Sequence, residues 1–341
     1  MLDMSRPAGT ASRSTGTAGA LALALLIVLS ACAGEDAESV TVGLITKQEA
    51  NPFWVTMREV AQDVADEHGV ELLTATGRSD VDVEAQVEAL RDMVDRGVAG
   101  VLIAPTDSAA VVPAIDEARA AGVVVIAVDT PTDPESAVDA LFATDNRRAG
   151  ELIGRYARAR ADKDGIEPKI ALLDLAPGIT SGELRRQGFL AGFGIEEGDP
   201  QIVGSVDTEG DRDKGERAMR QLLDQDPDIT IVYAVNEPAA LGAVQALDDA
   251  GTSRGDVVVV TVDGGCEAIK SGVRPGDIDA TAQQYPENMA REGVLALARA
   301  ARGGAAPSGD LDTGVTLITG APVDGVESRD VPFGVRNCWG D

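Results

Sequence analysis

The stretch 98-VAGVLIAPTDSAAVVPAIDEARAAGVVVIAVD-129 decides the fold class. It begins and ends with apolar, β-branched runs, 98–104 and 123–129, and a helix is expected between them at 108–121. A strand that is apolar along its whole length is buried on both faces, and two such strands joined by a helix lie parallel with a right-handed crossover. The stretch therefore predicts one unit of a parallel sheet covered by helices.

The same alternation of strand and helix runs through the chain from Val40 onward. Strands are expected at 40–45, 70–76, 98–104, 123–129, 169–174, 201–207, 229–235, 257–263 and 278–283. Helices are expected at 52–67, 83–96, 108–121, 147–160, 181–193, 213–224, 238–250 and 286–302. A length of 341 residues suits two domains, each with its own core. We predict an α/β protein of two doubly wound, parallel-sheet lobes.

Residues 1–31 are expected to be an export signal. Arginines precede an apolar run, 20–29, of about ten residues, which is too short for the ~20-residue helix that crosses a bilayer. The run ends in the letters LSAC, which resemble the bacterial lipobox and predict lipidation of Cys32. The alternative is plain signal cleavage near Ala31 with a free cysteine. Residues 32–39 would form a polar tether, placing the protein on the outer face of the cytoplasmic membrane.

The net charge of −28 excludes one class of partner. A strongly acidic surface repels the phosphates of nucleic acid and of anionic lipid headgroups. We therefore expect no nucleic-acid partner, and contact with the membrane through the lipid anchor alone.

Polar and aromatic side chains follow the expected strands at their carboxyl ends, where a parallel sheet binds ligands. They include Lys47, Asn51, Phe53, Trp54, Asp129, Asn236, Asp263 and Gln284. Carboxylates and amides can bind the paired hydroxyls of a sugar, and aromatic rings can cover its apolar faces at a small cost in entropy. The set predicts a sugar site between the lobes.

Each of these residues also has an ordinary structural explanation. Phe53 and Trp54 could be core residues at a helix start, where Pro52 suits the first turn. Asp129, Asp263 and Asn236 could cap helices or form turns, and Arg185 could lie on a solvated helix face. Convergence on one edge of both lobes favours the binding interpretation.

Catalysis has little support in the sequence. His68 is the one histidine and falls at an expected helix end, and no GxSxG motif is present. The acidic run of 207–213 lacks the EF-hand spacing of a calcium loop. Paired carboxylates would suit a glycoside hydrolase, but they suit a sugar receptor equally. We expect no enzyme, no cofactor and no metal.

Several motifs resemble one known family. They are NPFWVTM, PTDSAAVVPAIDEARAAGVVVIAVDTP, FATDNRRAGELIG, VNEPAALGA, VDGGC, QQYPENMA, DTGVTLIT and NCWGD. From Val40 to Trp339 the chain resembles the ribose-type sugar-binding proteins of bacterial ABC importers, and most closely their fructose-binding branch. The resemblance implies two Rossmann-like lobes joined by three hinge strands. The first lobe would comprise residues 40–144 plus 285–313, and the second residues 145–284 plus 314–341.

The resemblance also implies the ligand contacts and the partners. The contacts are Lys47, Asn51, Phe53, Trp54, Asp129, Arg185, Asn236, Asp263 and Gln284. Arg185 would neutralise Asp129 or Asp263 while the lobes close on a monosaccharide. A monomer would then deliver the sugar to a permease and its ATPase. The chain departs from the ribose-type pattern at Ala104, Thr130 and Gly210, where that pattern has Asn, Arg and an aromatic residue; this leaves fructose as the implied ligand.

Alternatives remain open at this stage. Cys266 and Cys338 form an even pair in an exported chain, so a disulfide is plausible, and two unpaired buried thiols are the other possibility. The same fold could bind another pentose or hexose, a polyol or a signal sugar. The sugar-responsive core of a transcription repressor shares the fold but would lack an export signal. A surface glycoside hydrolase is the remaining rival.

Overall fold

The structure is a computed structural model that describes residues 10–11, 40–252 and 255–340. The predicted lipidation site Cys32 and the tether lie outside the described residues, as does the export signal apart from Thr10 and Ala11. Within the described part of the chain, no helix is both long and apolar enough to cross a membrane. The described residues from Val40 onward form one compact unit.

The first of two six-stranded sheets, called sheet A, is built mainly from the first third of this unit. Its strands are β1 (Val40–Thr46), β2 (Val70–Thr76), β3 (Gly100–Ile103), β4 (Val124–Val128), β5 (Ala140–Ala143) and β11 (Gly309–Asp312). They lie in the order β11-β5-β4-β3-β1-β2, and every neighbouring pair is parallel. The unit quoted first, β3 to β4, thus has the predicted parallel pairing.

The second sheet, sheet B, has the equivalent arrangement. Its strands are β6 (Ile170–Asp174), β7 (Ile202–Asp207), β8 (Ile231–Ala234), β9 (Val258–Asp263), β10 (Ala280–Gln283) and β12 (Thr316–Thr319). The order is β12-β10-β9-β8-β6-β7, with β12 antiparallel to β10 and the other pairs parallel. The prediction of two parallel-sheet lobes is confirmed, with β12 as an antiparallel edge.

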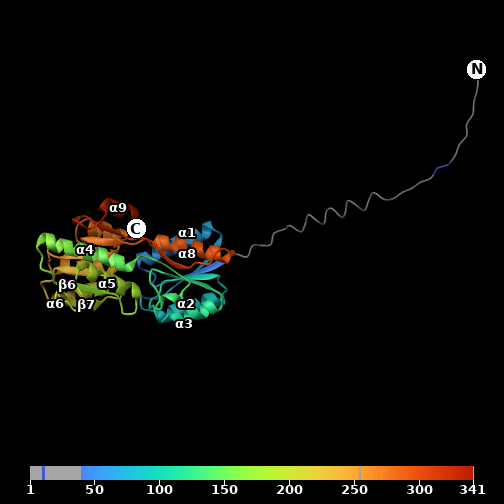
Figure 1. Ribbon diagram of the computed structural model, residues 1–341, viewed down its shortest axis with the longest axis horizontal. Coiled ribbons are helices and arrows are strands. Elements are labelled where there is room, and N and C mark those ends of the chain that lie inside the picture. Colours follow the sequence, from blue (N-terminus) through green and yellow to red (C-terminus); the bar gives the residue numbers. More distant parts are fainter. Residues whose placement is uncertain (1–9, 12–39, 253–254, 341) are drawn as a thin grey trace, which may run out of the picture. The chain divides into compact units, whose positions relative to one another are not determined.

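Helices cover both faces of each sheet (Figure 1). On sheet A, α1 (Pro52–Glu67) and α8 (Pro286–Ala301) share one core, and α2 (Val83–Asp95) and α3 (Val112–Ala120) share the other. On sheet B, α4 (Asn146–Asp164) and α5 (Thr180–Phe193) cover one face, and α6 (Arg212–Gln225) and α7 (Glu237–Asp249) cover the other. A short helix, α9 (Val331–Asn337), precedes the C-terminus. Sheet A with its helices is called lobe A, and sheet B with its helices lobe B.

Helix α3 begins four residues later than the sequence predicts. The side chain of Asp107 accepts hydrogen bonds from the backbone N–H groups of Ala109 and Ala110, which folds this segment into a turn. The backbone N–H of Ser108 donates to the carbonyl of Gly178 in lobe B, at 2.9 Å. Local capping and a contact with the other lobe therefore replace the first helical turn.

The chain passes between the sheets three times. It leaves sheet A after β5 and enters α4, which packs on β9 and β10 of sheet B. It returns after β10 into α8, which packs on α1, and crosses again between β11 and β12. Three segments of the chain therefore connect lobe A with lobe B.

Candidate functional site

A small cavity lies where the strand ends of lobe A and lobe B face each other. Its lining is Lys47, Asn51, Phe53, Trp54, Asp80, Asp129, Leu175, Ser181, Arg185, Asn236 and Asp263, and its volume is about 20 Å³. Every sequence-predicted contact residue lines it except Gln284, which is hydrogen-bonded to Asp263. The structure thus brings the predicted set together and adds residues that the sequence analysis did not single out.

Two carboxylates of the cavity stand on strained backbone. Asp129, after β4, has φ of 63°, and Asp263, at the end of β9, has φ of 102°. The N–H of Thr130 donates to the carbonyl of Val128 at 2.6 Å, which closes a three-residue turn around Asp129. Residues other than glycine rarely adopt positive φ, and such strain gathers at ligand sites. The strain is consistent with a fixed orientation of both carboxylates toward the cavity.

Arg185 joins the two lobes through these carboxylates. Its Nη2 lies 3.5 Å from Oδ1 of Asp129 and its Nη1 lies 3.6 Å from Oδ1 of Asp263, and all three side chains are buried. The guanidinium also donates to Oδ1 of Asn146 at 2.8 Å and to the carbonyl of Val235 at 3.2 Å. A buried charge needs such partners, so Arg185 is an inward-facing residue and not a solvated one.

Close backbone packing of α4 on α5 fixes the position of Arg185. A Cβ atom on Gly150 would lie 2.0 Å from the carbonyl oxygen of Arg185, and one on Gly188 would lie 2.1 Å from that of Arg147. Only glycine permits this approach of two helix backbones. The two glycines therefore fix α5, and with it Arg185, closely against α4.

Lys47 supplies the second cation of the cavity. It follows β1, is 2% exposed, and its Nζ donates to Oγ1 of Thr130 at 2.9 Å. The same Nζ lies 3.5 Å from Oδ2 of Asp129 and 5.5 Å from the centre of the Trp54 ring. The ammonium group is thus paired with a carboxylate and an aromatic face in place of water.

Phe53 and Trp54 lie in the first turn of α1. They belong to the core of lobe A and they also line the cavity. Asn51 caps the helix by accepting a hydrogen bond from the N–H of Phe53, and Pro52 occupies the first turn. The two rings are edge-to-face, with ring centres 4.8 Å apart. Trp54 Nε1 is buried with no hydrogen-bond partner in the described structure. An unpaired buried donor at a cavity indicates a place for a ligand acceptor.

Asn236 and Gln284 complete the lobe B side. Oδ1 of Asn236 accepts a hydrogen bond from the N–H of Ala239 and so caps α7, and its Nδ2 donates to the carbonyl of Gly210. Asn236 thus both caps a helix and lines the cavity. Gln284 donates to Oδ1 of Asp263 at 2.7 Å, and its own Oε1 is buried without a partner among the described residues. Burial raises the pKa of Asp263, and burial with the Asp263 carboxylate raises that of Glu237 to about 7.

Asp80 is a cavity residue that the sequence analysis missed. It follows β2, is 5% exposed, and its Oδ1 has no hydrogen-bond partner in the described structure. Burial raises its pKa to about 6, against the opposing influence of Lys47. The loop after β2 ends at the same sheet edge as the other strand loops, so the strand-end rule applied to 77–82 would have found it.

The buried carboxyls should make the protein in this closed conformation more stable as the pH falls from 7.5 to 5. Folding raises the pKa of Asp80 from 3.8 to about 6. The stabilisation from holding this proton is full below the unfolded pKa and is lost as the pH rises through 6, at most about 3 kcal/mol. We expect the unfolding temperature, measured by calorimetry, to increase less between pH 7.5 and pH 5 in the Asp80→Asn variant than in the unaltered protein.

A nearby carboxylate provides the control for this pH effect. Asp82 hydrogen-bonds with Arg78, which holds its pKa well below the usual range, so Asp82→Asn should leave the slope between pH 5 and 7.5 unchanged. Equal slopes for Asp80→Asn and the unaltered protein would contradict the assignment of Asp80 as a buried, proton-binding carboxyl.

The lobes touch each other directly around the cavity. Besides the Arg185–Asp129 pair, the hydroxyl groups of Thr130 and Ser181 are 2.8 Å apart. Pockets that bind small molecules have volumes of about 300–1,000 Å³, so a cavity of about 20 Å³ must widen to admit one. An adjoining cavity of about 320 Å³ shares Asn51 in its lining and reaches Trp339.

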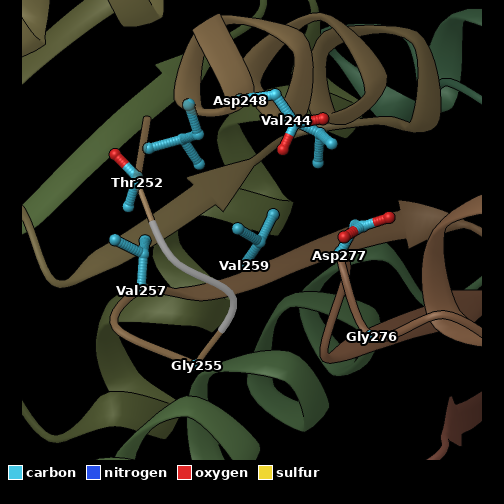
Figure 2. Close-up of a pocket in the computed structure, with 9 residues that line it drawn as sticks. Val244, Asp248, Thr252, Gly255, Val257, Val259, Gly276 and Asp277 are labelled. Atoms are coloured by element: carbon cyan, nitrogen blue, oxygen red, sulfur yellow. The ribbon is translucent and has the colours of Figure 1, made fainter. Parts of the chain in front are cut away.

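A pocket of about 30 Å³ beside α7 and β9 has Val244, Asp248, Thr252 and Val257 among its lining (Figure 2). It contains none of the strand-end residues. No group of metal-binding side chains occurs among the residues that the structure describes. Cys266 and Cys338 are joined in a disulfide.

The three departures from the ribose-type pattern have different surroundings. Ala104 is buried, and its carbonyl accepts a hydrogen bond from Gln86. Thr130 receives the Lys47 ammonium group. Gly210 has φ of 67°, and a Cβ there would lie 2.7 Å from Nδ2 of Asn236 and 2.9 Å from Leu175. A larger residue at 210 would therefore displace the cavity wall in this conformation.

Comparison with known proteins identifies the family. Residues 42–305 match the model of the periplasmic binding protein domain. The chain belongs to this family. The ribose import binding protein of Bacillus subtilis (strain 168) is 32% identical over 247 residues, which are 72% of this chain and 77% of that protein. The prediction of a ribose-type ABC solute-binding protein is confirmed.

Solved structures of this periplasmic binding protein family share the fold. An ABC transporter solute binding protein from Mycobacterium smegmatis with bound glycerol is 31% identical, with a TM-score of 0.72, and covers 82% of this chain and 93% of its own. A carbohydrate transporter solute binding protein from Agrobacterium radiobacter, in complex with D-arabinose, is 26% identical, with a TM-score of 0.76, and covers 85% and 97%. The chain is thus an extracytoplasmic sugar-binding protein of the ABC transporter class and not an enzyme.

Proposed function

We propose that this protein captures a monosaccharide, and most specifically fructose, between lobe A and lobe B and delivers it to the permease of an ABC importer. Polar groups from both lobes meet at one cavity. Buried atoms of Trp54 and Asp80 in its lining, and of Gln284 beside Asp263, have no partner in the described structure. A polyhydroxylated ring offers both acceptors and donors to such atoms. This convergence is the observation that carries the proposal.

The preference for fructose rests on the motif resemblance and on the composition of the cavity. One relative is named for ribose import, and the structure of another was solved in complex with D-arabinose. This chain lacks the arginine of the ribose-type pattern at Thr130, and the Lys47 ammonium from the end of β1 occupies that corner instead. We propose that this replacement of an arginine by Lys47 changes which hydroxyl groups of the sugar form hydrogen bonds with the protein.

The mechanism is closure around the three connecting segments, with lobes of 40–144 plus 285–313 and 145–284 plus 314–341. In the open state, Asp129 and Asp263 are hydrated and far apart. Closure lets Arg185 bridge the two carboxylates while both lobes bind the sugar. Because the sugar makes more contacts in the closed form than in the open form, its binding favours closure. We propose that this closed monomer, anchored through Cys32, docks on the permease, whose ATPase drives import.

A panel of free sugars tests the proposal. Purified residues 40–341 should show a higher unfolding temperature with D-fructose, since a ligand at 100 times its dissociation constant stabilises by about 2.7 kcal/mol. Calorimetric titration should give one site per chain. Stabilisation by D-ribose, D-allose or D-arabinose without D-fructose would support the second candidate, the same function with another monosaccharide. No response to any monosaccharide would contradict the proposed function.

A further inference from the structure

The last residues of the chain are fixed to lobe B beside the binding site. After α9, Cys338 forms the disulfide with Cys266, which lies three residues beyond Asp263. The backbone N–H of Cys266 also donates to the carbonyl of Trp339 at 2.8 Å. Residues 338–340 are called the C-terminal strap. A covalent bond and a hydrogen bond thus hold the strap at the end of β9.

From this anchor, Trp339 reaches into lobe A. Its ring is edge-to-face with that of Phe53, with ring centres 5.3 Å apart and planes at 84°. It is 7% exposed and belongs to the same buried cluster as Phe53 and Met289 of lobe A. Its Nε1 donates to the carbonyl of Gln284, where the chain passes from β10 to α8, at 3.0 Å. The indole therefore contacts both lobes and one connection between them.

The fit of the strap is close on both sides. A Cβ on Gly265 would lie 3.0 Å from Cζ3 of Trp339. A Cβ on Gly340 would lie 2.7 Å from Cβ of Pro52, at the start of α1. Close-packed contacts of this kind transmit displacement from one group to the next. Moving Trp339 would therefore move Phe53, Gln284 or both.

We propose that Trp339 is a positioning residue of the binding site and that the Cys266–Cys338 disulfide keeps it in place. The inference rests on the proposed function, because the groups that it positions are the ligand-binding ones. Phe53 supports Trp54 at the cavity, and Gln284 holds Oδ1 of Asp263. The strap is thus a fourth link between the lobes, in addition to the three chain crossings.

Binding measurements test the positioning role. With D-fructose as the probe, Trp339→Ala should weaken affinity about tenfold, the size of a lost aromatic pair with its hydrogen bond. Trp339→Phe, which keeps a ring against Phe53, should recover part of the loss. The double variant Cys266→Ser/Cys338→Ser should weaken affinity to a similar extent, and adding Trp339→Ala to it should cause little further loss.

A matched variant separates positioning from general stability. Phe333 lies in α9 against Arg329 and does not line the cavity, so Phe333→Ala should lower the unfolding temperature and leave the affinity unchanged. If the Trp339 and cysteine variants behave like Phe333→Ala, with lower stability and unchanged affinity, the strap is merely structural and the proposal is overturned.

Fluorescence tests the strap without any sugar. The chain has two tryptophans, so Trp54→Phe leaves Trp339 as the single emitter. Adding Cys266→Ser/Cys338→Ser to this variant should shift emission to longer wavelength and increase quenching by acrylamide. Unchanged emission and quenching would overturn the role of the disulfide. If the shift occurs but the unaltered protein binds no monosaccharide, the proposed function is refuted instead, so the two failures are distinguishable.

Discussion

Replacing Arg185 with methionine should weaken monosaccharide binding by about 2–5 kcal/mol. In the closed structure Arg185 is the cation between Asp129 and Asp263, one from each lobe. Without it, closure would bury two carboxylates that lack this compensating charge. The open form, in which both are hydrated, would then be favoured. Calorimetric titration measures the loss, and small-angle scattering should show a larger radius of gyration with sugar present.

The neighbouring arginine is the matched control for Arg185. Arg186 lies on the same helix, but it pairs with Asp174 and Glu197 and does not line the cavity. Arg186→Met should therefore lower stability and leave the affinity within about twofold, as expected for a residue outside the site. An Arg185→Met protein that binds as tightly as Arg186→Met would show that the bridge between the lobes has no part in binding.

Much of the fold could be predicted because its strands are apolar along their whole length. The β3–α3–β4 unit shows this, since burial on both faces leaves a parallel sheet as the natural arrangement. Strands β5, β11 and β12 were not predicted. Each is four residues long, and β11, GDLD, is exposed throughout, so no apolar pattern marks it. Their pairing depends on residues distant in the sequence, as in the parallel pairing of β5 with β11.

The predicted site residues that the structure brings together at one cavity include those that directly follow a strand. Asp129 and Asp263 are examples, because sheet topology alone brings such ends to one edge. Asp80 lies further along a loop, and its burial depends on how that loop folds. Trp339 is at the far end of the chain, and only the disulfide and the packing against Phe53 place it near the cavity. Such contacts between distant segments have no local signal in the sequence.

Asp263→Ala should cost about 2–5 kcal/mol of binding free energy and little stability of the ligand-free protein. The carboxylate accepts hydrogen bonds from the N–H of Glu237 and from Nε2 of Gln284, and it faces Arg185. Its removal leaves these donors without their acceptor when the lobes close. In the open form they would bind water, so the loss appears in the affinity for sugar.

The burial of Asp263 explains why Asp263→Ala should change the stability of the protein only slightly. In the closed conformation burial raises the pKa of Asp263, so its charged form costs free energy there and removal of the carboxylate offsets part of the lost hydrogen bonds. Asp279 is a matched control: burial also raises its pKa, to about 6, and it accepts from the N–H of Val259, but it precedes β10 and does not line the cavity. Asp279→Ala should therefore change stability without changing the dissociation constant. Because the two aspartates share a sheet and differ in which end they occupy, equal affinities for the two variants would place the ligand away from the carboxyl ends of sheet B.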